Sequence, residues 1–528
     1  MPAADITQDN TDARVDETTA LLAPSVADQP TAPEDGDDEN QIANDANGKG
    51  EDRPLPKDQI FLLCFARLIE PVAFFCIFPF VNQMIWETGE VAETDVGFYS
   101  GLIESLFSLT QMMLMIPWGK AADHFGRKPV LVGSLAGESV AIAIFGMSKK
   151  IWQMILFRCF AGVFAGTIVT IRTMITENST HKNQARAFSF FAFTGNLGIF
   201  LGPLLGGALA NPATEYPSVF GHVKLFREYP YALPTFVTGS IGLMATITTA
   251  IGVKEPGTAA EANKVPFWGL SAQTLVRSPK KSSTDSRKEM SILALLRSPN
   301  VPITLYIYAH IMLLAFSYTA IAPVFFFTPV HLGGFGFSPF QISLFMGLGG
   351  LSQSLWLLVA FPWLQGRWGT KRVMVLCAVA YPFFFALLPL CNLLLRYHVT
   401  AAFWTIAPIC LSVGSGVSMS FTAIQLVLND VSPGPEVLGT LNAVALTLVS
   451  GIRAFSPALF ASLFATSVRS RVLGGHVIWI LMVALALGFT VVSRWIPEPG
   501  KEKDLQRKHV DVGANGAGDG VVNGEAEE

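Results

Sequence analysis

Charged residues are scarce in this sequence. Only 14% of its 528 residues are Asp, Glu, Lys or Arg, while 51% are hydrophobic; soluble domains carry about a quarter charged residues. This balance excludes a string of ordinary soluble domains and predicts one membrane-embedded body. The chain begins with an acidic, polar stretch, so we expect no cleavable signal peptide.

Cysteine and catalytic motifs are scarce as well. All six cysteines lie in apolar stretches without a C-x-x-C pair, which favours small core residues over disulfides. Walker loops, nucleophile elbows and H-E-x-x-H motifs are missing. We therefore expect no enzyme, no resident cofactor or metal, no nucleic-acid partner and no ATP-driven pump on this chain.

The two ends of the chain are acidic. Residues 1–58 hold fifteen acids against four bases, and residues 497–528 hold eight against four. With so few apolar residues, both tails are expected to be disordered and cytosolic. The stretch from Glu17 to Leu21 and Leu22 fits an acidic dileucine sorting signal, which leaves the plasma membrane and the vacuolar membrane as equal alternatives.

Long apolar runs fill the rest of the chain. Only helices and closed barrels satisfy their backbone in lipid, and these runs have the length of spanning helices. They predict an all-α polytopic membrane protein with twelve transmembrane helices. The expected spans are 60–86, 96–118, 130–148, 151–176, 185–210, 231–253, 302–330, 339–363, 373–395, 399–428, 437–465 and 475–496.

Lys and Arg are unevenly shared between alternate loops. With a cytosolic N-terminus, the inner loops carry sixteen and the outer loops seven. Because cytosolic loops are the ones enriched in Lys and Arg, both termini are expected in the cytosol. Arg469 and Arg471 lie in an outer loop and run against the bias.

The basic segment 254–301 divides the spans six and six. The stretch Phe125-Gly-Arg-Lys after span 2 resembles Trp368-Gly-Thr-Lys after span 8, and Gly202-Pro203 resembles Ser456-Pro457. These echoes predict duplication of a six-span unit, and two packed halves with a central site are a transporter plan. The expected parts are the tail 1–58, the halves 59–253 and 302–496, the linker 254–301 and the tail 497–528.

The loop after span 2 contains a motif of its own. Gly119 allows close helix approach, Gly126 permits a tight turn, and Arg127 and Lys128 keep the loop in the cytosol. Asp123 can accept hydrogen bonds from helix-end amides or pair with an arginine. A loop that only had to stay in the cytosol would need the basic residues but not Asp123 and the two glycines.

These residues resemble the inner-loop motif G-x-x-x-D-x-x-G-R-K of the major facilitator superfamily. Arg158 to Gly166 resembles that superfamily's R-x-x-x-G pattern. A third resemblance, to its drug:proton antiporters, rests on Gly198, Gly202, Pro203, Gly206 and Gly207 in span 5.

Further stretches, such as Ala66–Pro71, are similar to the fungal antiporter branch near the plant zinc-induced-facilitator-like proteins. The resemblance covers about 59–500 and implies the major facilitator fold. It also implies alternating access driven by a proton gradient. We expect the small residues of span 5 to let it approach span 8, and Pro203 to bend it at a gate.

Charged residues inside the spans are candidate machinery, because each costs about 2.5–3.5 kcal/mol at a helix centre. Arg67 and Glu70 share a helix face and can pair. The resemblance places spans 1, 4, 7 and 10 around the cavity, so Glu70 and Arg158 are the first candidates for proton handling. Glu104 comes next.

The other ionisable residues have weaker assignments. Glu138 is expected to form a structural ion pair. Arg172 is a cavity candidate, and its place near the inner end of span 4 also allows a latch with Glu177 and Asp123. Arg453 has no evident acidic partner. His310 is a cavity candidate, although a lone His among apolar residues is more often a hydrogen-bonded core residue. The aromatic and Met side chains expected near the cavity are Phe74, Phe75, Phe78, Phe164, Tyr306, Phe316, Tyr318, Trp404 and Met419.

Together these features predict a monomeric transporter in a lipid bilayer that exports a drug-like or secondary-metabolite solute in exchange for protons. One alternative is a facilitator or symporter of a nutrient or metal chelate. Another is a transporter-shaped receptor without flux. The residues do not name the solute.

Overall fold

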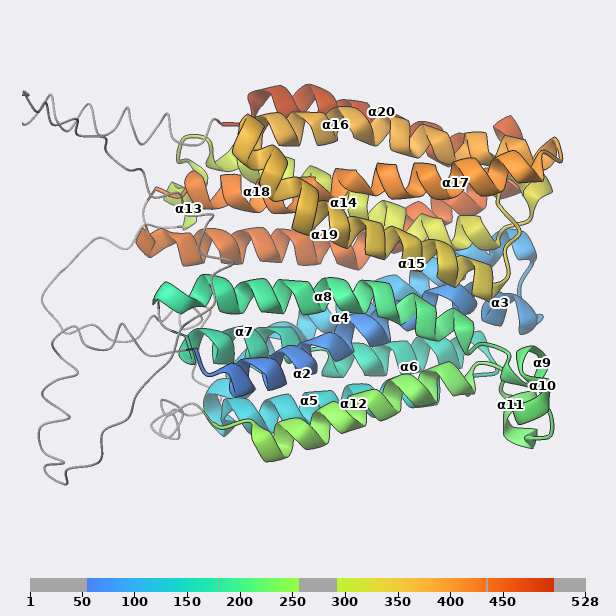
Figure 1. Cartoon of the computed structure of the whole chain (residues 1–528), viewed down its shortest axis with the longest axis horizontal. Helices are drawn as coiled ribbons and strands as arrows, with labels where there is room; N and C mark the ends of the chain where they lie inside the picture. The colour runs from blue at the N-terminus through green and yellow to red at the C-terminus, as the bar shows by residue number, and fades with distance from the viewer. Residues whose placement is uncertain (1–54, 180, 256–291, 434, 498–528) are drawn as a thin grey trace, which may run out of the picture. The chain divides into compact units, whose positions relative to one another are not determined.

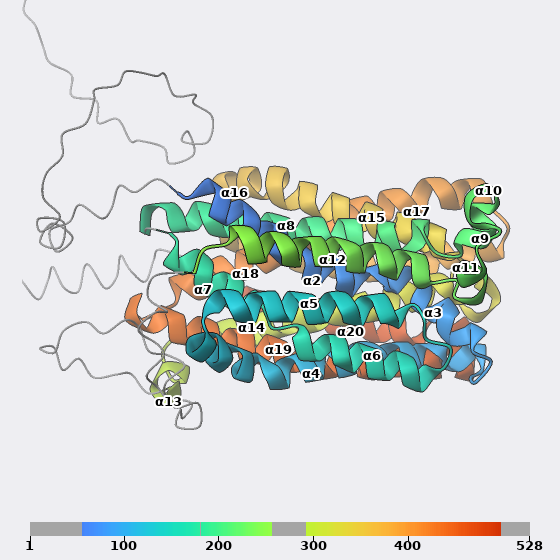
Figure 2. The same ribbon diagram turned by 90° about the horizontal axis from the view of Figure 1, so that it is seen from below.

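Long helices lie side by side in the computed structural model (Figures 1 and 2). The structure describes residues 55–179, 181–255, 292–433 and 435–497. The predicted acidic tails, most of the linker and the sorting signal of Glu17, Leu21 and Leu22 lie outside these residues. All described helices belong to one compact unit.

The N-terminal segment, residues 57–255, contains the first set of helices. These are α2 Lys57–Cys76, α3 Phe78–Glu87, α4 Val96–Phe125, α5 Arg127–Phe145, α6 Ile151–Phe164, α7 Thr167–Glu177, α8 His181–Ala208, α9 Pro212–Glu215, α10 Pro217–Phe220, α11 Lys224–Glu228 and α12 Ala232–Gly252, with a 3₁₀ turn at Glu93–Asp95.

The C-terminal segment, residues 292–497, contains the second set. These are α13 Ile292–Leu296, α14 Val301–Phe327, α15 Pro339–Leu355, α16 Phe361–Arg396, α17 Thr400–Gly414, α18 Met419–Asp430, α19 Pro435–Ser470 and α20 Val477–Val492. A π-helical turn, Trp356–Ala360, joins α15 to α16, and 3₁₀ turns lie at Val330–Leu332, Ser415–Ser418, Val472–Gly475 and Ser493–Trp495.

Ten helices in the described residues are long and apolar enough to cross a membrane. One of them, Pro339–Arg396, is 58 residues long and contains Gly369 with non-helical φ 80° and ψ 158°, so it includes two expected spans. The 30-residue α4 is not among the ten, because Glu104 and several Ser, Thr and Gln residues lower its hydropathy. The all-α membrane fold is confirmed, while the count of twelve remains a prediction.

Both described ends of the chain lie at the same end of the helix bundle, where α2 begins and α20 ends (Figure 1, left). We call this the terminal end. The short helices α9, α10 and α11 lie at the opposite end. There Lys149 forms an ion pair of 2.6 Å with Glu228, and this hydrogen-bonded cation lowers the pKa of the Glu228 carboxyl.

Several spans are broken near their middle. Span 1 changes from α2 to α3 at Ile77, span 4 from α6 to α7 at Ala165 and Gly166, and span 10 from α17 to α18 through Ser415–Ser418. A broken helix leaves backbone carbonyls that need other donors inside the membrane. Ala165 in span 4 has the non-helical dihedrals φ −75° and ψ 42°, whereas Ile77 keeps helical dihedrals. The span 4 break therefore creates a polar position at the depth where a transport site is expected.

A tryptophan packs against a glycine at two of these breaks. Trp118 lies against Gly166, where an added Cβ would be 2.5 Å from the indole, and it donates its N–H to the Val163 carbonyl. Trp356 lies against Gly416 and donates to the Ser412 carbonyl at 2.9 Å. The N- and C-terminal segments thus stabilise their breaks in the same way.

The two segments meet closely at the opposite end. Gly97 and Gly101 of α4 face Pro457 and Ala461 of α19, and a Cβ on Gly101 would lie 2.5 Å from the Ala461 Cβ. Nearby, the Ala458 amide donates to the Ser105 hydroxyl at 2.7 Å. Small side chains let membrane helices approach, so this end is closed in the present conformation.

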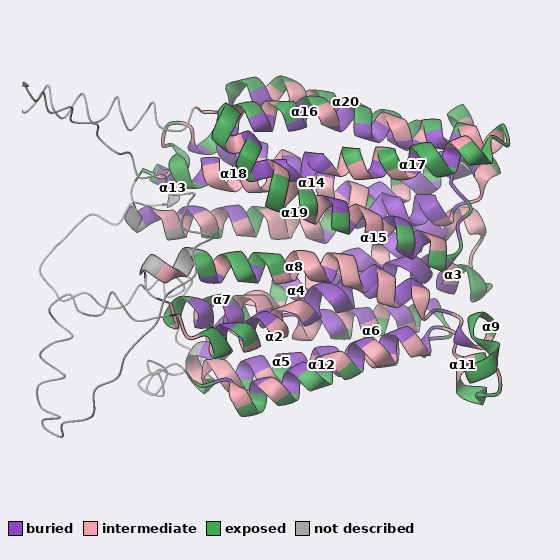
Figure 3. Cartoon of the chain, in the orientation of Figure 1, coloured by how far each residue is buried: buried purple, intermediate pink, exposed green. Residues whose placement is uncertain are grey.

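Buried residues face the neighbouring helices and exposed ones face outward (Figure 3). Phe325, Phe385 and Trp479 are fully buried in the C-terminal segment, while Phe383 and Trp363 are exposed. Exposed large apolar side chains on both segments fit a body surrounded by lipid.

Candidate transport site

A cavity of about 100 Å³ lies between the two segments. A single water needs about 10–15 Å³, so the cavity has room for several waters or the polar part of a solute. Its charged residues are Glu70, Arg172 and Arg453. The other lining residues are Ser108, Gln111, Met112, Met115, Ile168, Val169, Phe316, Leu446, Val449 and Ser450.

Glu70 is the carboxylate of this cavity and is only 4% exposed. Arg67 lies 3.5 Å from Oε2, as the three-residue spacing predicted. Gln111 donates to Oε1 at 2.9 Å, and Thr167 donates to Oε2 at 3.0 Å. Two hydrogen-bond donors, from α4 and α7, and the ion pair with Arg67 therefore hold the carboxylate in place.

The break in span 4 builds part of this arrangement. Thr167 is the first residue of α7, directly after the break, which places its hydroxyl beside Glu70. Gln111 also donates to the freed Ala165 carbonyl at 2.8 Å. One amide thus satisfies both a broken helix and the buried carboxylate, as a low-dielectric interior requires.

Arg158 forms a second charged group with Glu104, and it is 2% exposed. Its guanidinium carbon lies 4.2 Å from the ring centroid of Phe107 and 4.9 Å from that of Phe74. It also donates to the Phe74 carbonyl at 3.4 Å. The aromatic rings stabilise this cation by cation–π contact.

Glu104 is 7% exposed and lies on the same helix as Phe107. The two cations whose charges act on it are Arg158 and Arg453. Arg453 also contacts Phe74, with its guanidinium carbon 4.6 Å from the ring centroid. The residue that the sequence left without a partner therefore joins this group from the C-terminal segment.

Arg172, one of the cavity candidates, lies at the cavity. It is exposed and lines the cavity, and it shares the Phe191 ring with Arg67, at 5.4 Å and 5.0 Å. No ion pair joins Arg172 to Glu177 among the described residues. The ion pair of Glu177 is with Arg127, at 3.3 Å.

Glu138 also departs from its expected role. It is 2% exposed, its Oε2 has no hydrogen-bond partner, and no ion pair is present for it among the described residues. A structural ion pair is thus not formed. The charges that act on it are those of Glu70, Arg158 and Arg67.

Other candidates lie away from the cavity. His310 bonds to the Leu485 carbonyl at 3.0 Å and packs on Phe489 of α20, which is the core role that a lone histidine favours. Of the aromatic and Met side chains expected near the cavity, only Phe316 lines it.

The inner-loop motif lies at the terminal end. Gly126 adopts φ 99° before α5, a conformation that favours glycine. The Glu255 carboxylate accepts from the backbone amides of Arg127 at 2.6 Å and Lys128 at 2.9 Å. Glu255 thus caps the N-terminus of α5, where a negative charge is favoured.

The structure tests the expected role of Gly119 but not that of Asp123. A Cβ on Gly119 would meet nothing within 4 Å, so Gly119 makes no close helix contact in this conformation and that expectation is corrected. The Asp123 side chain lies outside the described part of the chain.

The glycines of α8 approach a different helix from the one expected. Gly198 faces Pro71, Gly202 faces Phe75 and Val72, and Gly206 faces Cys76, all close to α2. Only Gly207 meets α15, at Ser343. The approach of span 5 to span 8 depends instead on Gly347 and Gly350 of α15, which face Leu204 and Phe200.

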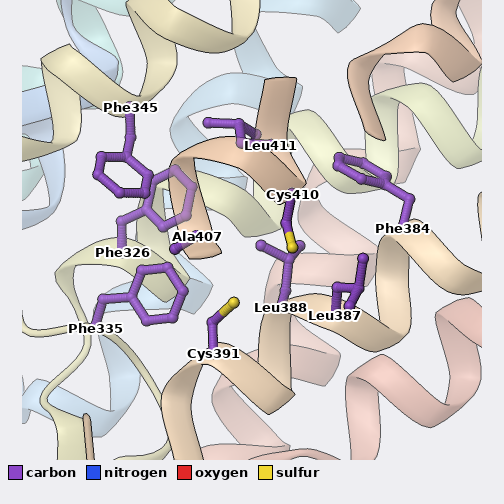
Figure 4. Close-up of a pocket in the computed structure, with 10 residues that line it drawn as sticks. All are labelled: Phe326, Phe335, Phe345, Phe384, Leu387, Leu388, Cys391, Ala407, Cys410 and Leu411. Carbon is purple, nitrogen blue, oxygen red and sulfur yellow. The ribbon is translucent and has the colours of Figure 1, made fainter. Parts of the chain in front are cut away.

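A second hollow lies wholly within the C-terminal segment, among aromatic and aliphatic side chains with Cys391 and Cys410 (Figure 4). Its volume is about 10 Å³, which is room for one water at most. It is a packing gap and not a transport site.

Sequence reasoning missed the donors Gln111 and Thr167 and the ring of Phe191. Gln111 could have been found, because Glu104, Ser108 and Gln111 share one face of α4 at helical spacing. Thr167 and Phe191 give no such signal, since the break in span 4 and the packing of α8 place them.

These features define a polytopic membrane protein with a charged cavity between two helical segments. The sequence model of the Major Facilitator Superfamily matches residues 63–457. The chain belongs to this superfamily, whose members are membrane transporters and not enzymes, as the sequence resemblance predicted.

Two similar proteins place it within the family. The chain is 45% identical over 478 residues to the efflux pump azaK of Aspergillus niger, covering 90% of this chain and 96% of azaK. It is 26% identical over 455 residues to Protein ZINC INDUCED FACILITATOR-LIKE 1 of Arabidopsis thaliana, covering 84% and 92%. Likeness to fungal efflux proteins and to the plant branch is thereby confirmed.

A solved structure shares the fold. A bacterial homologue of the human lysosomal transporter Spinster, in an inward-facing and unoccupied conformation, gives a TM-score of 0.58. The match covers 84% of this chain and 98% of that protein at 16% identity.

Proposed function

We propose that this chain is a proton-coupled antiporter that exports a drug-like or secondary-metabolite solute by alternating access. The observation that carries the proposal is the position of Glu70. Its buried carboxylate lines a cavity between two segments and is held by Arg67, Gln111 and Thr167. A carboxylate placed in this way can exchange a proton when the cavity opens to either side.

Coupling requires that proton and solute favour different conformations. A ligand shifts a conformational equilibrium only by its difference in affinity for the two states. A proton on Glu70 neutralises the charge that Arg67 balances, and the freed donors then rearrange within the cavity. Solute binds the ionised cavity in the conformation described here, and a proton favours the opposite conformation, in which the proton replaces the solute.

Two observations support export from the cytosol as the direction of transport. The 45% identical relative is named an efflux pump. The segments also meet closely at the end opposite the termini, at Gly101 and Gly207. With both termini in the cytosol, this conformation is the one that takes up solute from the cytosol.

The lining favours an organic solute. Phe316 and two methionines, Met112 and Met115, form much of the wall, and such surfaces suit apolar or aromatic molecules. The plasma membrane and the vacuolar membrane both fit export from the cytosol.

Glu70→Gln tests the proposal. Purified protein is reconstituted into vesicles that contain a pH-sensitive dye, and a panel of drug-like solutes is screened for those that the natural protein accumulates under an imposed pH gradient. We expect Glu70→Gln to lower solute-driven proton movement to the rate of empty vesicles. Glu228→Gln, an exposed carboxylate far from the cavity, is the control and should behave as the natural protein.

Transport that continues after the pH gradient is collapsed would contradict the antiport mechanism. Solute entry in the same direction as protons would favour the alternative, a symporter or facilitator of a nutrient or metal chelate. Binding of solute without any accumulation would favour a receptor.

A further inference from the structure

Arg453 reaches from the C-terminal segment into a group of charges that otherwise belongs to the N-terminal segment. It lines the cavity with Glu70 and Arg172. No hydrogen bond or ion pair fixes its guanidinium among the described residues, and its close contact is the Phe74 ring at 4.6 Å.

Phe74 is shared by two arginines from different segments. The guanidinium carbon of Arg158 lies 4.9 Å from the same ring centroid. Since both charge centres lie within 5 Å of one point, they are at most about 10 Å apart. Two like charges at this separation repel each other inside a protein unless a negative charge balances them.

Glu104 supplies that negative charge. It is buried, it lies on the helix whose Phe107 ring also contacts Arg158, and Arg158 and Arg453 are the cations that act on it. Ser105, the residue after Glu104, belongs to the closely packed contact between α4 and α19, where its hydroxyl accepts from the Ala458 amide.

We infer that Arg453 is the residue through which the C-terminal segment responds to the charge of Glu104. When Glu104 is ionised, it holds Arg453 beside Phe74 and stabilises the present conformation. When Glu104 is protonated, Arg158 and Arg453 repel each other and the two segments separate at this level. The inference deepens the proposed function and rests on it, because it assigns a residue that converts protonation into movement.

The surrounding charges are few. From α2 they are Arg67 and Glu70, from α5 Glu138, from α6 Arg158 and from α7 Arg172. Helices α14 and α20, which pack on α19, contain no Asp, Glu, Lys or Arg, and the nearest acid on α18 is its last residue, Asp430. The ionised Glu70 carboxylate attracts Arg453, as the ionised Glu104 carboxylate does. Protonation of Glu70 therefore adds to the repulsion between Arg158 and Arg453.

The test measures conformation without any solute. Spin labels are placed at Phe125→Cys and Ala443→Cys, two exposed positions on α4 and α19, in a variant whose six natural cysteines are replaced. Double electron–electron resonance in lipid nanodiscs gives the distribution of distances between the two labels, and hence the populations of the conformations, between pH 5 and pH 8.

We expect the population of the present conformation to fall as the pH is lowered. Arg453→Gln should reduce the pH-dependent change in the population ratio by about tenfold, while Arg453→Lys should keep much of it. Glu104→Gln should hold the low-pH populations at every pH. Arg494→Gln, an exposed arginine in the turn that follows α20, is the control and should leave the response unchanged.

An undiminished pH response in Arg453→Gln would overturn the inference, as would a natural protein whose populations do not change with pH. If Arg453→Gln does not fold, Arg453→Lys and Glu104→Gln decide the question in the same way. The vesicle assay with Glu70→Gln is separate. A pH response that needs Arg453, without proton-driven transport, would leave this inference standing and remove the antiport proposal.

Discussion

A single amide, that of Gln111, links the buried carboxylate to the broken helix. It donates to both Glu70 and the Ala165 carbonyl, at 2.9 Å and 2.8 Å. Because both acceptor residues are buried, loss of this side chain leaves two buried acceptors short of a donor. The position of the Glu70 side chain therefore depends on hydrogen-bond donors as well as on the charge of Arg67.

Gln111→Met tests this dependence. We expect a loss of about 1–2 kcal/mol in the free energy of unfolding, since buried hydrogen bonds in membrane proteins contribute modestly. Thermal unfolding in nanodiscs measures it. Gln83→Met, which removes a bond to Glu87 at the surface, is the control and should change stability by less than about 0.5 kcal/mol. Equal stability of the two variants would show that Gln111 does not hold the site.

At the scale of elements, the contact between α4 and α19 closes one end of the cavity. Gly97, Gly101 and Ser105 follow each other at four-residue spacing and face Pro457 and Ala461. The same two helices also line the cavity, with Ser108 of α4 and Ser450 of α19. One part of each helix therefore closes the end, and another part forms the cavity wall.

Gly101→Val should weaken this closure. The new side chain overlaps the Ala461 Cβ and the Pro457 carbonyl, and overpacking costs about 1–3 kcal/mol, which is about a 5–150-fold change in population. We expect faster labelling of Ser450→Cys by a membrane-impermeant thiol reagent supplied on the side opposite the termini. The background lacks the natural cysteines.

Gly133→Val is the matched control, because a Cβ at Gly133 meets nothing within 4 Å. Labelling of Ser450→Cys that is equally slow in both variants would mean that the α4–α19 contact does not close that end.

At the scale of the whole molecule, contacts between the segments join the two sets of helices, and we expect these contacts to hold the sets together without the covalent connection. Gly207 against Ser343, Gly350 against Phe200 and Ser105 against Ala458 join them at several points. Such packing is enough to keep membrane helices associated.

Co-expression of residues 1–270 and 271–528 as two chains tests this view. We expect the two pieces to purify together from detergent through a tag on one of them. Introducing Gly101→Val and Gly207→Val together should reduce the recovery of the untagged piece. Pieces that separate without these substitutions would show that the connection itself is needed.

The sequence by itself determined the class of protein, most of the spans, the Arg67–Glu70 pair and the superfamily. Apolar length, helical spacing and short motifs are local properties, and each is legible in one stretch of chain. It also pointed to the buried charges Glu104 and Arg158, because any charge in an apolar run is costly.

Only the tertiary structure decided which charges meet. Arg453 joins Arg158 at Phe74, Glu255 caps α5, and the glycines of α8 lie against α2. These contacts join residues far apart in the chain, and they depend on where helices break and how they cross. No local pattern encodes that geometry, since it results from the packing of all the helices together.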